Sequence, residues 1–197
     1  QALIDEAVKK AANADAVLLF VGNNREVETE SFDRQQFQLP FGQDKLIKAV
    51  CAVTPKTIVV VVAGAPSDLS VADSSSKTIV WSWFNGSQAG TALADVLTGK
   101  VNPSGRLPFT IPAKINDSPA HALGIFPGDS VTTYEEGLFV GYRWFDNKEI
   151  TPKFPFGYGL SYTTFEYGDM SPDKEKYRLN DSIKITLRIR NSGGMDG

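Results

Sequence analysis

The first hundred residues alternate between two patterns of apolar positions. Helical spacing, as in Leu3, Ala7 and Ala11, predicts an amphipathic helix there and further helices at residues 43–53 and 88–98. Continuous apolar runs rich in β-branched residues predict buried strands at residues 15–22, 57–64 and 78–83. Because strands and helices alternate, we expect an α/β fold: a three-layer sandwich with a mostly parallel sheet and right-handed crossovers.

The pattern changes after residue 100. Residues 101–165 are rich in proline, glycine and aromatic residues and have few regular periods, and long irregular segments of a compact domain are often functional. Residues 183–189 then alternate apolar and polar positions, which predicts a half-buried antiparallel strand. Since one or two strands do not form a stable sheet, we expect the end of the chain to be a truncated β segment.

Composition and charge exclude several kinds of partner. The 20 basic and 23 acidic residues are interspersed, so we expect no nucleic acid, and the longest apolar runs are far too short to cross a membrane. Cys51, the only cysteine, is expected to be buried as a small hydrophobic residue. His121 is the only histidine, and no His, Cys and carboxylate cluster has metal-ligand spacing. We therefore expect no metal, no other cofactor, and no Cys-His or Ser-His-Asp site.

Three carboxylates follow the first predicted strand: Glu26, Glu28 and Glu30. In an extended conformation residues two apart share a face, so these side chains would be crowded together. Crowding of like charges favours protonation of one member of such a group, which is what a general acid requires. The loop also begins at the carboxyl end of a parallel strand, where ligands of open α/β sheets collect. A solvated acidic loop is the alternative that the residues alone leave open.

Five longer motifs occur in a fixed order along the chain: VGNNREVETESFDRQQFQLPFGQDKLIKAV, VVVVAGAP, WFNGSQAGTALADVLTGKVNPSGRLPFTIP, YEEGLFVGYRWFD and PFGYGLSYTTFEY. Through these motifs the chain resembles the family 3 glycoside hydrolases, in particular the β-glucosidases, over nearly its whole length. The combination of NPSGRLP with PFGYGLSYT is the most specific part of the resemblance.

The resemblance implies a longer enzyme with a catalytic (β/α)8 barrel first, this α/β sandwich second and a fibronectin type III-like domain last. Residues 1–165 would be the sandwich domain, and residues 166–197 the truncated beginning of the third domain. The enzyme would be a retaining β-glucosidase that hydrolyses terminal non-reducing β-D-glucosyl residues of glucosides or oligosaccharides, with its nucleophile in the barrel. The isolated chain would then be inactive, and a secreted or periplasmic location is slightly favoured.

The acid/base glutamate of the family lies on the loop after the first strand, before a glycine that precedes an Asp-Arg pair. Residues 30–34 (ESFDR) match this pattern, with Ser31 in place of the usual glycine. The resemblance therefore implies that Glu30 is the acid/base residue, with Glu28 as the second choice. Asp33 and Arg34 are expected to form a structural ion pair or to anchor the loop.

Two other functions compete with this interpretation. One is a non-catalytic carbohydrate-binding or scaffolding module that keeps the sandwich without the chemistry. The other is a flavodoxin-like nucleotide binder, which is disfavoured because the GxxxxGKS/T and GxGxxG patterns are missing. Trp81 and Trp83 end the third strand, where a ring can stack on a sugar, but we expect both to pack against other side chains and one of them to fill the core. No substrate-binding residue is assigned.

Overall fold

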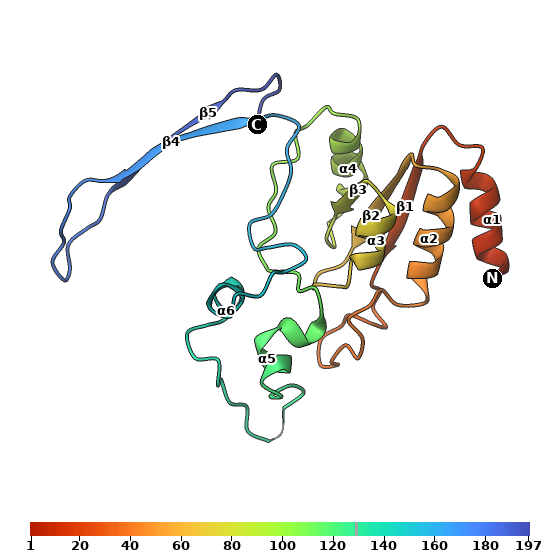
Figure 1. The fold of residues 1–197 in the computed structure, drawn as a ribbon. Helices are drawn as coiled ribbons and strands as arrows, with labels where there is room; N and C mark the ends of the chain where they lie inside the picture. The colour runs from red at the N-terminus through yellow and green to blue at the C-terminus, as the bar shows by residue number, and fades with distance from the viewer. Residues whose placement is uncertain (129) are drawn as a thin grey trace. The chain divides into compact units, whose positions relative to one another are not determined.

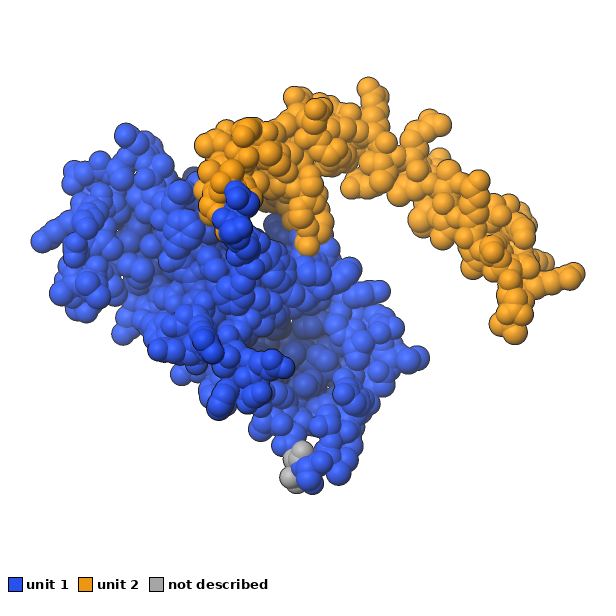
Figure 2. Space-filling view, turned by 180° about the vertical axis from the view of Figure 1, so that it is seen from behind, with its two compact units in different colours: residues 1–88, 107–158 blue, residues 89–106, 159–197 orange. Residues whose placement is uncertain are grey.

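The structure is a computed structural model that describes residues 1–128 and 130–197. The chain forms two compact units, which Figure 2 colours separately. Unit 1 contains residues 1–88 and 107–158, and unit 2 contains residues 89–106 and 159–197. Each unit is therefore described by itself.

Unit 1 is built on a parallel sheet of three strands in the order β1-β2-β3. The strands are β1 (Val17–Gly22), β2 (Thr57–Val62) and β3 (Thr78–Trp81). Val17 pairs with Thr57, and Ile58 pairs with Thr78, so the carboxyl ends of all three strands meet at one edge. The β-branched run of β2 forms the central strand, where Val59, Val60 and Val61 are fully buried.

Three helices of unit 1 pack against one face of this sheet: α1 (Ala2–Ala11), α2 (Gln43–Val53) and α3 (Ser70–Ser75) (Figure 1). The core lies between them and contains Ile47 and Val50 of α2 together with alternate residues of β1 and β2. Alternate strand residues share a face, which explains why Leu19 and Val21 are buried while Leu18 and Phe20 are exposed. The predicted α/β fold class with a parallel sheet is confirmed.

Between residues 107 and 158, the part of unit 1 that the structure describes contains only short regular elements. These are the 3-10 helix η1 (Ile115–Asp117), α5 (Pro119–Ala122) and α6 (Tyr142–Asn147). An isolated bridge joins Ile111 to Phe154 and connects this region to the core. The segment that the sequence leaves without regular periods is therefore held by turns and by buried aromatic side chains of α6, such as Trp144 and Phe145.

Unit 2 contains α4 (Ala89–Leu97) and an antiparallel pair, β4 (Phe165–Pro172) and β5 (Ile185–Asn191). The alternation of the sequence predicts β5 but not β4. Almost all side chains of both strands are exposed. Asn102 joins the NPSGRLP motif to the GYGLSYT segment, because its side-chain oxygen accepts hydrogen bonds from the Ser161 hydroxyl (2.9 Å) and the Tyr162 N–H (2.8 Å).

Four further expectations concern single features. Cys51 packs against the edge of the core and is half-buried, so the expected burial is only partial. No helix within residues 1–128 and 130–197 has the length and apolarity that a membrane span requires. In the same ranges no group of three or more His, Cys, Asp or Glu side chains is arranged to hold a metal ion. The proposed domain boundary between residues 165 and 166 stays a prediction.

Candidate active site

The acidic loop begins at the carboxyl end of β1 and runs to α2. Gly22 ends β1 with a φ of 142°, and a Cβ there would lie 2.6 Å from the carbonyl carbon of Val62. The side chain of Gln43 forms two hydrogen bonds with the backbone of Gly22. It accepts one from the Gly22 N–H (2.6 Å) and donates one to the Gly22 carbonyl (2.8 Å). The start of α2 therefore fixes the point at which the loop leaves the sheet.

The loop is a series of turns and not an extended segment. The carbonyl of Asn24 accepts hydrogen bonds from the N–H groups of Val27 and Glu28, and Thr29 forms a bridge with Phe32. Residues two apart therefore do not share a face, so the predicted crowding of Glu26, Glu28 and Glu30 on one face is wrong. The three carboxylates have different surroundings.

Glu28 is half-buried and hydrogen-bonded. Its Oε2 atom accepts hydrogen bonds from the Nδ2 group of Asn23 (2.8 Å) and from the N–H of Gly64 (3.3 Å). Asn23 follows β1 and Gly64 follows β2, so Glu28 connects the ends of two neighbouring strands. The Glu28 carboxylate therefore holds the loop in place through these two hydrogen bonds.

Glu30 is exposed, at the tip of the turn. The next residue, Ser31, has a φ of 72°, which lies in the left-handed region that favours glycine. Ser31 therefore stands at a backbone position that glycine would adopt without strain.

Arg34 anchors the other end of the turn, and anchoring the loop is one of the two roles expected for this residue. Its guanidinium donates hydrogen bonds to the carbonyl of Pro66 and to the hydroxyl of Ser67 (3.2 Å), which is fully buried. Burial lowers the pKa of Arg34, and attraction to the Glu28 carboxylate opposes this effect. In the described part of the chain Arg34 forms no ion pair with Asp33, so the other expectation is wrong.

The aromatic residues at the end of β3 pack together. Trp81 and Trp83 lie edge to face with ring centroids 5.8 Å apart, and both contact Phe109, at 5.6 and 5.2 Å. The expectation that both tryptophans pack is confirmed. Phe84 is half-exposed, and its ring lies against Gly64 beside Glu28.

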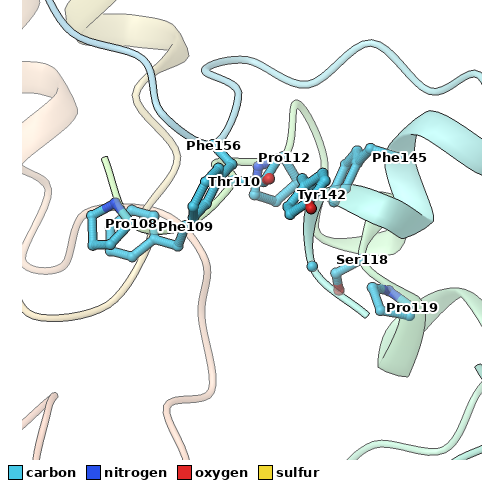
Figure 3. Close-up of a pocket in the computed structure, with 10 residues that line it drawn as sticks. Pro108, Phe109, Thr110, Pro112, Ser118, Pro119, Tyr142, Phe145 and Phe156 are labelled. Atoms are coloured by element: carbon cyan, nitrogen blue, oxygen red, sulfur yellow. The ribbon is translucent and has the colours of Figure 1, made fainter. Parts of the chain in front are cut away.

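A cavity of about 300 Å³ in unit 1 lies elsewhere, among residues 108–119 and 141–156 (Figure 3). Its lining is mainly proline and aromatic, and the rings of Tyr142 and Phe156 lie 5.1 Å apart there. Ser118 also lines it and contacts His121, with Oγ 3.0 Å from Nδ1. The Ser118 hydroxyl donates its proton to the Ile115 carbonyl (2.8 Å), so this pair is a helix-start contact and not an activated nucleophile.

Comparison with known proteins identifies the family. Residues 1–162 match the model of the glycosyl hydrolase family 3 C-terminal domain. The chain therefore belongs to glycoside hydrolase family 3, of which it contains the C-terminal α/β domain.

The similar proteins are considerably longer than this chain. It is 42% identical over 200 residues to beta-glucosidase BoGH3A of Bacteroides ovatus and 44% identical over 196 residues to thermostable beta-glucosidase B of Acetivibrio thermocellus. Each alignment covers 99% of this chain but only 27% and 26% of those proteins. The crystal structure of the Bifidobacterium adolescentis GH3 beta-glucosidase superposes with a TM-score of 0.89 at 39% identity, over 98% of this chain and 28% of that one. The chain thus spans about a quarter of the length of the curated relatives that it matches.

Sequence reasoning missed the residues that hold the loop. Asn23, Gly64 and Ser67 are small or uncharged and lie outside the acidic cluster, so no charge pattern marks them. The one available signal was their position at or shortly after the carboxyl ends of predicted strands, where loop residues of a parallel sheet meet.

Proposed function

We propose that this chain is part of a retaining β-glucosidase and supplies its acid/base glutamate, Glu30. The nucleophile lies in a (β/α)8 barrel domain, and the substrate is a β-glucoside or oligosaccharide with a terminal non-reducing β-D-glucosyl residue. Residues 166–197 begin a fibronectin type III-like domain. The chain alone is inactive, because a retaining glycosidase needs two carboxyl groups about 5–5.5 Å apart.

The left-handed conformation of Ser31 carries the choice of Glu30. It supports the match between residues 30–34 and the family's acid/base motif, in which the glutamate precedes the glycine. Exposure also favours Glu30, because a proton donor must reach a substrate held by another domain. Glu28 is the second choice, since its Oε2 already accepts two hydrogen bonds within the loop.

In the proposed reaction Glu30 donates its proton to the glycosidic oxygen while the barrel's carboxylate attacks the anomeric carbon and the aglycone leaves. Glu30 then takes a proton from water, which attacks the same carbon and releases the carboxylate and glucose. Both steps need Glu30 on the same side of the sugar ring as the leaving group. The barrel must therefore meet unit 1 at the carboxyl edge of β1 and β2.

Glu30→Ala in the polypeptide that joins this chain to the barrel tests the assignment. Hydrolysis of phenyl glucoside should fall by about 10²–10⁴-fold, because general acid catalysis contributes that much. Dinitrophenyl glucoside should still form the glycosyl-enzyme, since its leaving group departs without a proton. Azide should then restore turnover and give glucosyl azide, because it attacks the anomeric carbon without needing a base.

The control is Glu28→Gln, which keeps an acceptor oxygen for the two loop hydrogen bonds. If Glu28→Gln is inactive and Glu30→Gln is active, the acid/base residue is Glu28. If neither substitution changes turnover, or if the joined polypeptide binds glucosides without hydrolysing them, the chain is a non-catalytic carbohydrate-binding module instead.

A further inference from the structure

We infer that Glu28 is a positioning residue, which holds the turn that carries Glu30 against the turn after β2. The inference rests on the proposed function, in which Glu30 transfers the proton. The role of Glu28 is distinct from that of Glu30, because Glu28 acts through protein hydrogen bonds and not on substrate.

Both donors to Glu28 are themselves fixed. Asn23 is 8% exposed, and its N–H donates to the carbonyl of Val62 at 2.9 Å. Gly64 is part of the chain that follows β2 directly. One donor is a backbone N–H and the other is the side chain of a buried residue that is itself bonded to β2, so the Glu28 carboxylate is tied to the ends of both strands.

The space at Gly64 is shaped by the Glu28 carboxylate. A Cβ built there would lie 2.7 Å from Glu28 Oε1 and 3.3 Å from the ring of Phe84. The φ of Gly64 does not lie in the left-handed region, so the backbone conformation does not require glycine. A side chain at this position would therefore act mainly by displacing the Glu28 carboxylate.

The turn has a second attachment to the same place. Arg34 binds Pro66 and Ser67, two and three residues beyond Gly64. The arc from Glu28 to Arg34 is therefore held at both ends by residues 64–67, and Glu30 lies within it. Because a misplacement of about 1 Å can reduce a rate by about 10²-fold, this attachment matters for proton transfer.

Three variants of the joined polypeptide test the inference: Glu28→Ala, Glu28→Gln and Gly64→Ala. Glu28→Ala should lower kcat/KM for phenyl glucoside by about 10²-fold but change kcat/KM for dinitrophenyl glucoside only a few-fold, because kcat/KM reports formation of the glycosyl-enzyme and only phenyl glucoside needs the acid in that step. Gly64→Ala should give the same selective loss without altering Glu28 itself. Glu28→Gln should stay within a few-fold of the parent, and Gln36→Ala, on an exposed part of the same loop, should not differ from it.

Hydrogen exchange of residues 24–34 gives a readout that does not need activity. Exchange should rise in Glu28→Ala and Gly64→Ala and stay unchanged in Glu28→Gln. Equal losses on both glucosides, or a Glu28→Gln variant as impaired as Glu28→Ala, would overturn the positioning role. Azide rescue of Glu28→Ala with no rise in the exchange of residues 24–34 would also overturn it, since Glu28 would then be the acid/base residue. If only the Glu30 assignment fails, Glu30→Ala stays active while the exchange pattern still holds.

Discussion

Gly22→Ala should lower the free energy of unfolding of unit 1 by more than the cost of placing alanine at a positive φ. An added Cβ would meet three backbone atoms of Val62, with the carbonyl carbon at 2.6 Å and the nitrogen at 2.8 Å, and the carbonyl oxygen closer still. These atoms belong to the paired strand β2 and cannot rotate away as the end of a side chain would. β1 must therefore separate from β2 at its carboxyl end.

The magnitude has three parts. A residue other than glycine at positive φ costs about 1–2 kcal/mol, and overpacking costs about 1–3 kcal/mol. Displacing the Gly22 backbone also weakens its two hydrogen bonds with Gln43, each contributing about 0.5–1.5 kcal/mol. The free energy of unfolding should therefore fall by about 3 kcal/mol or more.

Gly42→Ala is the matched control, because Gly42 has a φ of 71° and no atom lies within 4 Å of a Cβ built there. Only the backbone cost should apply, about 1–2 kcal/mol. Urea unfolding followed by fluorescence of the Trp81 and Trp83 cluster in unit 1 measures the difference. With a slope of about 1–3 kcal/mol per molar urea, the Gly22→Ala midpoint should drop by about 1 M or more. Equal midpoints for the two variants would refute the reasoning.

Four smaller predictions concern other parts of the chain. Ile47→Ala, at a fully buried position, should lower the unfolding free energy by about 2–5 kcal/mol in the same urea assay. Ser31→Gly should cause no loss and a gain of up to about 1 kcal/mol, because it relieves a left-handed conformation. Asn102→Ala should destabilise unit 2 by about 1–3 kcal/mol, since it leaves the Tyr162 N–H without its partner; circular dichroism on heating can detect this. Burial raises the pKa of the Cys51 thiol, so at pH 8 less thiolate is present than in the unfolded chain, and iodoacetamide should react more slowly with native protein until the pH rises above that pKa.

The elements that could be predicted from the sequence are those whose apolar positions repeat with a helical or strand period. The predicted helix at residues 43–53 has the bounds of α2, and the apolar run at 57–64 contains β2. α3 was missed because its sequence, SVADSS, is short and polar, and β4 was missed because FEYGDMSP has no sustained alternation of apolar and polar residues. The third strand ends at Trp81, two residues earlier than predicted, because Trp83 has a φ of 58°.

The loop illustrates why a site is harder to predict than a fold. The position of the carboxylates after β1 followed from the sequence, but their grouping on one face did not, because Asn24 closes a turn that the spacing of the glutamates could not reveal. Hydrogen bonds from backbone groups to single side chains, such as that of Gly64 to Glu28, have no repeating pattern along the chain.

Two glycines with different physical reasons make this loop possible. Gly22 gives the end of β1 a backbone conformation and a closeness to Val62 that no side chain allows, whereas Gly64 leaves room for a carboxylate. Ser31 differs from these two glycines, because it carries a side chain at a φ that favours glycine. A strained backbone conformation persists only where the surrounding contacts hold it. The hydrogen bonds of Glu28 and Arg34, on either side of Ser31, therefore hold Ser31 in its left-handed conformation. It follows that Glu28→Ala should raise the exchange of the Ser31 amide more than Ser31→Gly does, because the attachment and not the residue type fixes the turn.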